Sequence, residues 1–549
     1  MRPDRPFLSR REFLHASAVA AAMAGRPARA LAQGETLGAE EATAPIAAGT
    51  PALSATLLEA DGSPLDAERL KTLHVRDLAN DPLPQAINIS VGNARVELAR
   101  EPLQFSVRLK VPGFGEVYCY ADNDGRGYAK PGSVDYIVAA AQTRLRRVRL
   151  ALQQARRAGV PRDAEIERHL ALAARPLPAA PALARTAAAY ESLAHGLHAG
   201  EKLTLQAARH RIARLAQPRR DFQFGCLMAG FNRFGPEYEQ RLSALFNFAT
   251  VSWYTWKDEL PEEKRIDYTR MDDSINWCRA HGITPKGFGY VYLSRGATPE
   301  WIRAWPYEKV LPEYERVVAQ TLRRYRDTLH HVEVINEAHD KTNLWRFSHA
   351  QILELTRAAC RAARQGSPTV RRQINHCCLW AEYAKRRNED GTRRWSPYRY
   401  LQECVASGVE FETIGLQLYY PSHDLFEIER MLDRFKAFKR PIHITEMAAA
   451  SVDGLDPNSM RPKTLTPGWH GPWTETMQAD WLEAIYTLCY SKPEFEAVGW
   501  WDLADTDGHF WPYGGLLHKD MTPKESYFRL QKLQRDWGVA KPTASVKTE

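Results

Sequence analysis

Two glutamates of this chain each follow a run of β-forming residues, which would place acid–base chemistry at the ends of strands. Residues 331–336 lead directly to Glu337, and residues 441–445 lead to Glu446. A carboxylate at the end of a buried strand can face a catalytic mouth instead of the core. Glycoside hydrolysis requires two facing carboxylates, because one protonates the leaving oxygen while the other attacks or activates water. Either glutamate alone could equally be an acid near a helix N-terminus or an ion-pair partner.

Eight apolar, strand-like runs follow residue 220, and most intervals between them carry a helical pattern, as residues 274–281 and 352–360 do. This alternation predicts an α/β fold of the (β/α)8 TIM-barrel type, whose active site lies at the carboxyl ends of the strands. Glu337 and Glu446 would then end the fourth and seventh strands. The predicted strands are 222–228, 248–254, 285–292, 332–336, 371–378, 413–420, 441–446 and 497–503.

The residues before the barrel have different periodicities. Short β-type runs separated by Asp-Gly and Gly-Asn turns predict a small all-β, sandwich-like domain, and a helical period then predicts a helical connector that is interrupted by a proline-rich stretch at 175–182. The predicted segments are a signal peptide at 1–32, a linker at 33–50, the β domain at 51–134, the connector at 135–218, the barrel at 219–540 and a tail at 541–549.

The charge pattern argues against a nucleic-acid partner. The net charge of +8 arises from 74 basic and 66 acidic residues in a chain that is 44% hydrophobic, an ordinary globular composition. Arginines of the predicted connector alternate with apolar residues at helical spacing, which is typical of a solvated helix face. These arginines are Arg144, Arg146, Arg147, Arg149, Arg156 and Arg157.

The N-terminus predicts export from a bacterial cytoplasm. Residues 9–14, Ser-Arg-Arg-Glu-Phe-Leu, precede a short run of small apolar residues and a small-x-small cleavage site at 30–32. Paired arginines before a weakly apolar core resemble the twin-arginine export signal, so we expect a periplasmic or extracellular protein. The apolar run is far shorter than the roughly 20 residues that span a bilayer, which predicts no stable membrane insertion after cleavage.

Cysteine and histidine spacings indicate neither a disulfide framework nor a metal site. The 8 cysteines are scattered, and no His-x-His or His-Glu-x-x-His spacing occurs. The sequence His376-Cys377-Cys378 could supply ligands, but neighbouring cysteines in an apolar strand more often pack in a core. We therefore predict no cofactor and no metal.

Several motifs resemble those of glycoside hydrolase family 10, the xylanase family. Residues 335–338, Ile-Asn-Glu-Ala, resemble its Val-Asn-Glu-Ala acid/base motif, and residues 443–446, His-Ile-Thr-Glu, resemble its Ile-Thr-Glu nucleophile motif. Residues 414–417 resemble its Ile-Gly-x-Gln sixth strand, residues 497–507 its eighth strand and residues 516–527 its closing segment. The resemblance is specific because the motifs occur in the family's order.

The resemblance implies an endo-1,4-β-xylanase-like retaining hydrolase of a plant-type polysaccharide. Glu337 would be the general acid/base and Glu446 the nucleophile, so their environments should keep the first protonated and the second ionised. Asn336 would bind the sugar 2-hydroxyl, and Gln417 would bind substrate or orient the nucleophile. Two alternatives stay open: the same chemistry on a non-xylan glycan or glycoside, and a non-catalytic glycan-binding protein.

The family's polar sugar-binding residues are largely replaced by aromatic ones. Residues 252–257, Ser-Trp-Tyr-Thr-Trp-Lys, stand where the family has Glu-Asn-x-x-Lys-Trp, and residues 287–292 lack its histidine. All 15 tryptophans follow residue 252. Because aromatic faces stack on sugars, we predict an aromatic binding surface, although any single tryptophan could instead fill the barrel. The candidates are Trp253, Trp256, Tyr292, Tyr419, Trp501 and Trp511.

Overall fold

The computed structural model describes residues 46–251, 259–339, 342–419 and 422–539. All of them fall in one compact unit, which spans residues 41–549. The predicted signal peptide, most of the predicted linker and the predicted tail lie outside the described residues.

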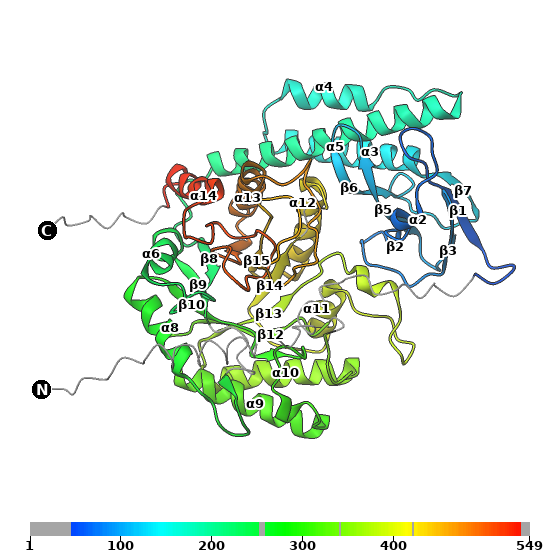
Figure 1. The fold of residues 1–549 in the computed structure, drawn as a ribbon. Coiled ribbons are helices and arrows are strands. Elements are labelled where there is room, and N and C mark those ends of the chain that lie inside the picture. Colours follow the sequence, from blue (N-terminus) through cyan, green and yellow to red (C-terminus); the bar gives the residue numbers. More distant parts are fainter. Residues whose placement is uncertain (1–45, 252–258, 340–341, 420–421, 540–549) are drawn as a thin grey trace, which may run out of the picture. The chain divides into compact units, whose positions relative to one another are not determined.

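Parallel strands close into the predicted (β/α)8 barrel (Figure 1). Each strand pairs with the next, and β16 pairs with β8 to close the ring. The third barrel strand is split into β10 and β11, both of which pair with β12. The strands are β8 (Gln223–Leu227), β9 (Phe248–Val251), β10 (Thr284–Gly287), β11 (Val291–Tyr292), β12 (His331–Asn336), β13 (Arg371–His376), β14 (Thr413–Leu418), β15 (Ile442–Met447) and β16 (Phe495–Trp500).

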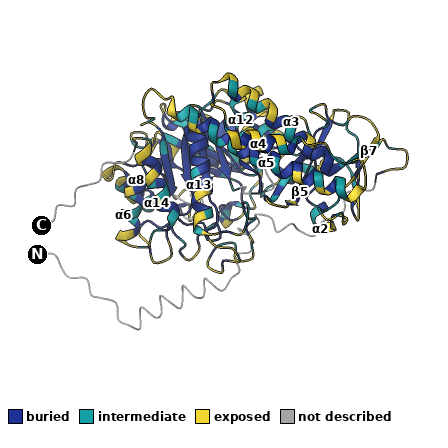
Figure 2. Cartoon of the chain, turned by 90° about the horizontal axis from the view of Figure 1, so that it is seen from above, coloured by how far each residue is buried: buried dark blue, intermediate teal, exposed yellow. Residues whose placement is uncertain are grey.

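Helices cover the outside of the barrel, so the strands are buried on both faces (Figure 2). Some of these helices begin at side-chain caps: Ser348 and Gln351 form a reciprocal capping box for α10, and Asp424 accepts from two amides in the first turn of α12. These helices are α6 (Pro236–Leu245), α8 (Thr269–Ala280), α9 (Tyr307–Arg324), α10 (His349–Gly366), α11 (Pro397–Ala406), α12 (Leu425–Arg434), α13 (Glu475–Tyr490) and α14 (Glu525–Asp536).

The expected β-sheets precede the barrel. One sheet has the order β3-β4-β1-β7, in which β1 and β7 are parallel, and the other has the order β2-β5-β6. Apolar residues of both sheets share one core with the helices α3 and α5. The elements are β1 (Ala52–Thr56), α2 (Ala67–Leu70), β2 (His74–Asp77), β3 (Ile87–Ser90), β4 (Asn93–Glu97), β5 (Leu103–Val111), β6 (Gly115–Ala121), β7 (Gly132–Asp135), α3 (Tyr136–Arg157), α4 (Ala164–Ala173) and α5 (Ala182–Ala213).

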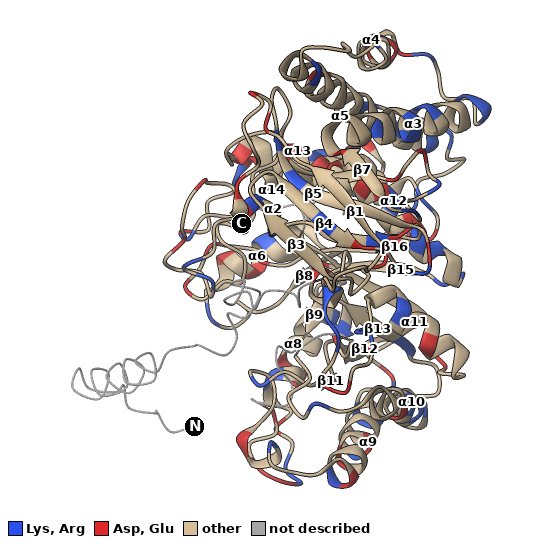
Figure 3. Cartoon of the chain, turned by 90° about the vertical axis from the view of Figure 1, so that its right-hand side faces the viewer, with Lys and Arg blue, Asp and Glu red and all other residues tan. Residues whose placement is uncertain are grey.

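The interpretation of the α3 arginines as a solvated face is wrong for two of them. Basic positions follow α3 in Figure 3, but Arg144 and Arg147 are buried. Arg144 donates two hydrogen bonds, of 3.0 and 2.7 Å, to Asp424 at the start of α12. Arg147 bonds Glu427 on the same helix at 3.0 Å. Their spacing looked amphipathic because their acidic partners lie about 280 residues away in the chain.

The cysteines lie among the described residues, and all except Cys378 are buried. His376 and Cys377 lie in the interior at the end of β13, as packing residues do. Within the described ranges, no group of three or more His, Cys, Asp or Glu side chains could hold a metal ion. Among the helices described, none is both long and apolar enough to cross a bilayer.

Candidate active site

Glu337 lies immediately after β12, at the carboxyl end of the barrel. Its backbone adopts a left-handed φ of 52°, which is unusual for a residue with a side chain and is often found at functional sites. Tyr292 Oη donates to Glu337 Oε2 at 2.9 Å, and Gln417 Nε2 donates to Oε1 at 2.7 Å. The carboxylate is therefore held by groups from β11 and β14.

Glu446 lies in β15 and is only 4% exposed. Tyr419 Oη donates to its Oε2 at 3.0 Å. Gln417, which bonds Glu337, is the register partner of Glu446 across the β14–β15 pair. The two carboxylates thus flank one amide side chain, and each accepts a hydrogen bond from a tyrosine.

Burial raises the pKa of Glu446 well above the ordinary glutamate value of 4.5, and the nearby charges of Glu333 and Glu337 raise it further. The hydrogen bond from Tyr419 and the charge of Lys286 act in the opposite direction. The resemblance implied that this carboxylate stays ionised, whereas its burial disfavours ionisation. The charge of Glu337 is therefore one of the causes that disfavour ionisation of Glu446.

A chain of polar side chains positions the residue before Glu337. Asn375 Nδ2 donates to Asn336 Oδ1 at 3.0 Å, and Thr445 Oγ1 donates to Asn375 Oδ1 at 2.6 Å. A Cβ at position 415 would lie 2.4 Å from Asn375 Oδ1, so the glycine of the Ile-Gly-x-Gln motif makes room for this amide. Sequence reasoning missed Asn375, although an amide inside an apolar strand is a signal that could have identified it.

The aromatic candidates divide into contacting tyrosines and buried tryptophans. Tyr292 and Tyr419 touch the carboxylates, whereas Trp501 and Trp511 are 4% and 6% exposed. Trp511 stacks on Tyr419 with 5.0 Å between ring centroids, and Trp501 packs against Phe288 with 5.5 Å between ring centroids. The other two candidates, Trp253 and Trp256, lie outside the described residues.

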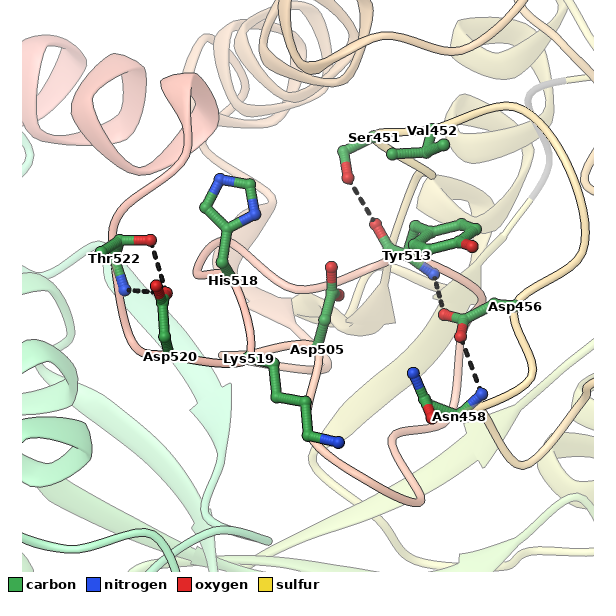
Figure 4. Close-up of a pocket in the computed structure, with 10 residues that line it drawn as sticks. All are labelled: Ser451, Val452, Asp456, Asn458, Asp505, Tyr513, His518, Lys519, Asp520 and Thr522. Atoms are coloured by element: carbon green, nitrogen blue, oxygen red, sulfur yellow. Dashed lines mark hydrogen bonds between the residues drawn. The ribbon is translucent and has the colours of Figure 1, made fainter.

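A separate cavity of about 590 Å³ lies between the loops that follow β15 and β16 (Figure 4). Its charged groups are largely compensated: Asp456 lies 2.8 Å from His509, and Asp505 lies 2.5 Å from Lys524. None of the predicted site residues lines it. The lining residues are Ser451, Val452, Asp456, Asn458, Asp505, Tyr513, His518, Lys519, Asp520 and Thr522.

The family model described as Glycosyl hydrolase family 10 matches residues 215–532. Endo-1,4-beta-xylanase 2 of Arabidopsis thaliana is 22% identical over 336 residues, which are 59% of this chain and 28% of that protein. Anti-sigma-I factor RsgI6 of Acetivibrio thermocellus is 20% identical over 58% of this chain and 37% of its own length. The chain therefore spans well under half the length of these curated relatives.

Solved xylanase structures also resemble a part of the chain. Xylanase 10B of Thermotoga petrophila in complex with xylobiose matches 58% of this chain and 95% of its own, with 20% identity and a TM-score of 0.47. Native xylanase 10B of Thermotoga maritima matches 58% of this chain and 97% of its own, with 19% identity and a TM-score of 0.47.

Proposed function

The chain belongs to glycosyl hydrolase family 10, and on that basis we propose that it hydrolyses β-glycosidic bonds of a plant-type polysaccharide as an endo-1,4-β-xylanase-like enzyme. The observation that carries the proposal is the pairing of Glu337 and Glu446 around Gln417. The names of the xylanase relatives point to xylan as the first glycan to test.

In the proposed reaction, Glu337 donates its proton to the leaving glycosidic oxygen while the Glu446 carboxylate attacks the anomeric carbon. The carbon–oxygen bond breaks, and a glycosyl ester forms on Glu446. A water molecule then gives a proton to Glu337 and attacks the anomeric carbon, which releases Glu446 and retains the configuration. Asn336 supports this scheme as a donor to the 2-hydroxyl, because the chain of Asn375 and Thr445 fixes its orientation.

The first experiment compares wild type with Glu446→Gln on xylan, arabinoxylan, mixed-linkage glucan and mannan. We expect soluble oligosaccharides from at least one polymer with wild type and a loss of several orders of magnitude with the variant, at unchanged thermal stability. Cleavage of another glycan instead of xylan would support the same chemistry on a different substrate. Near-normal turnover by Glu446→Gln would remove this residue as the nucleophile.

The role of Glu337 has its own test. Glu337→Ala should hydrolyse an aryl glycoside with a good leaving group through its first step but stall at the ester, because no base activates water. Added azide should restore turnover and give a β-glycosyl azide, which NMR would identify. A folded variant that azide does not rescue would contradict the acid/base role.

A non-catalytic glycan-binding function is the alternative from another class. A binding protein gains nothing from an acid and a nucleophile at the ends of strands of one barrel. The position of Gln417, which donates to Glu337 and is the register partner of Glu446, therefore favours catalysis. Binding of xylan without product formation by wild type would favour the alternative.

We also propose export through the twin-arginine pathway, from residues 9–14 alone. Replacement of Arg10 and Arg11 by lysine should retain the precursor inside a bacterial cell, and fractionation followed by immunoblotting would detect it. Export of the double variant at the wild-type level would contradict the proposal.

A further inference from the structure

Arg461 is a half-buried arginine for which the described residues offer no acceptor. It lies in the loop between β15 and α13, and its buried Nε has no hydrogen-bond partner there. No described carboxylate lies within ion-pairing distance of its guanidinium. Most other buried or half-buried arginines of this protein have such partners, as Arg144 and Arg147 do. A guanidinium kept partly out of water without an acceptor suits a ligand that brings one.

The guanidinium is held against the aromatic side of the candidate active site. Its Cζ lies 4.1 Å from the ring centroid of Phe510 and 5.5 Å from that of Trp511. Both rings contact Tyr419, with centroids 5.6 and 5.0 Å apart, and Tyr419 in turn donates to Glu446. Arg461 is therefore one aromatic layer away from the proposed nucleophile.

Backbone hydrogen bonds fix this position. Gly508 N–H donates to Asn458 O, and Met460 N–H donates to His509 O, both at 2.8 Å. These bonds fasten the loop that carries Arg461 to the segment just before Phe510. Ser459 Oγ also accepts the Arg461 N–H at 3.0 Å. The arginine is thus preorganised, so little conformational entropy is lost when it binds a ligand.

We propose that Arg461 is a specificity-determining residue that binds the carboxylate of a uronic-acid side group on the polysaccharide. The guanidinium presents parallel N–H groups that match a carboxylate in a bidentate pair, which is stronger than a hydrogen bond to a neutral hydroxyl. The side chain is only half-buried while it stacks on Phe510, so its terminal N–H groups are the ones that such a group would meet. This inference rests on the proposed function, and it narrows the substrate to an acidic, branched xylan.

The test compares one polymer in two forms, a xylan that carries uronic-acid side groups and the same xylan after its carboxyl groups are reduced to alcohols. For wild type we expect higher kcat/KM on the acidic form. Arg461→Met, which keeps the length of the side chain without its charge, should lose roughly ten- to hundredfold on the acidic form, as for a lost hydrogen bond to a charged group, and little on the reduced form. Arg461→Lys should fall between them, because a point charge replaces the fork.

Arg440 provides a matched control, because its guanidinium also stacks on a phenylalanine, Phe411 at 4.2 Å, but at the amino end of β15. Arg440→Met should leave the acidic-to-reduced ratio unchanged. Equal losses on both polymers with Arg461→Met, or no loss, would overturn the inference.

Affinity electrophoresis of the Glu446→Gln variant measures binding of the acidic and the reduced polymer without cleavage. It therefore tests the inference separately from the proposed function. If wild type cleaves neither polymer, the proposed function fails. The inference then stands only if Arg461→Met abolishes preferential retardation by the acidic polymer, and it falls if no such preference exists.

Discussion

At the residue scale, Tyr419 controls how readily the proposed nucleophile ionises. Its hydrogen bond stabilises the Glu446 carboxylate and lowers a pKa that burial raises. Tyr419→Phe should therefore raise this pKa further. Since the nucleophile must be ionised, the acidic limb of the kcat/KM pH profile should move to higher pH by about one to two units, the equivalent of a hydrogen bond to a charged group.

Tyr292→Phe is the control for that profile, because it removes the same hydroxyl from Glu337 instead of Glu446. It should leave the acidic limb near its wild-type position. An acidic limb that stays in place in Tyr419→Phe would show that this hydrogen bond does not tune the nucleophile.

At this scale the sequence could predict those site residues that lie in or directly after recognisable strands. Glu337, Gln417 and Glu446 end or lie in strands of one barrel, so knowing the strands is enough to bring them together. Asn375 and Arg461 were missed because their importance depends on contacts with Asn336 and Phe510, far away in the chain. Such contacts have no periodicity to detect.

At the element scale, the third barrel strand differs from its predicted form. The β-forming run at 285–292 predicted one strand, but the chain leaves the ladder between β10 and β11. Gly289 has a φ of 55° in this break, a conformation that glycine adopts at little cost. The Gly-x-Gly spacing at residues 287–289 is a turn signal, but the apolar residues around it favoured the prediction of one continuous strand.

The intact part of that strand carries a buried charge pair, which gives a prediction about the barrel. Lys286 Nζ on β10 lies 2.9 Å from Glu333 Oε2 on β12, and both side chains are almost fully buried. Lys286→Met should lower the free energy of unfolding by about 3–5 kcal/mol, because Glu333 loses its counter-charge. Adding Glu333→Gln should recover much of this loss. Urea unfolding of the single and double variants would measure both, and equal stabilities of the two would contradict the account.

At the scale of the whole molecule, buried arginines of α3 connect the N-terminal sheets to the barrel. Arg147 contacts Asp122 after β6, Gln104 on β5 and Glu427 on α12, at 3.0, 2.8 and 3.0 Å. Sequence alone could predict both regions but not this connection, because an arginine at helical spacing looks the same whether water or a distant carboxylate solvates it. The N-terminal region is thus stabilised by the barrel as well as by its own core.

This connection predicts how the protein responds to mutation and to acid. Arg147→Met should lower the free energy of unfolding by about 3–5 kcal/mol, because Asp122 and Glu427 stay buried but lose one of their positively charged partners. Arg149 is exposed, so Arg149→Met should change the free energy of unfolding by less than about 0.5 kcal/mol.

Although burial raises the pKa of Glu427, the guanidiniums of Arg430 and Arg147 hold that pKa below its ordinary value of 4.5. A carboxylate with a depressed folded-state pKa adds stability above its unfolded pKa and loses it as the pH falls. The difference in stability between wild type and Arg147→Met should therefore shrink as the pH falls below about 4.5. Thermal unfolding of both proteins across a range of pH would measure it. A difference that stays constant with pH would show that Arg147 acts by packing and not by charge.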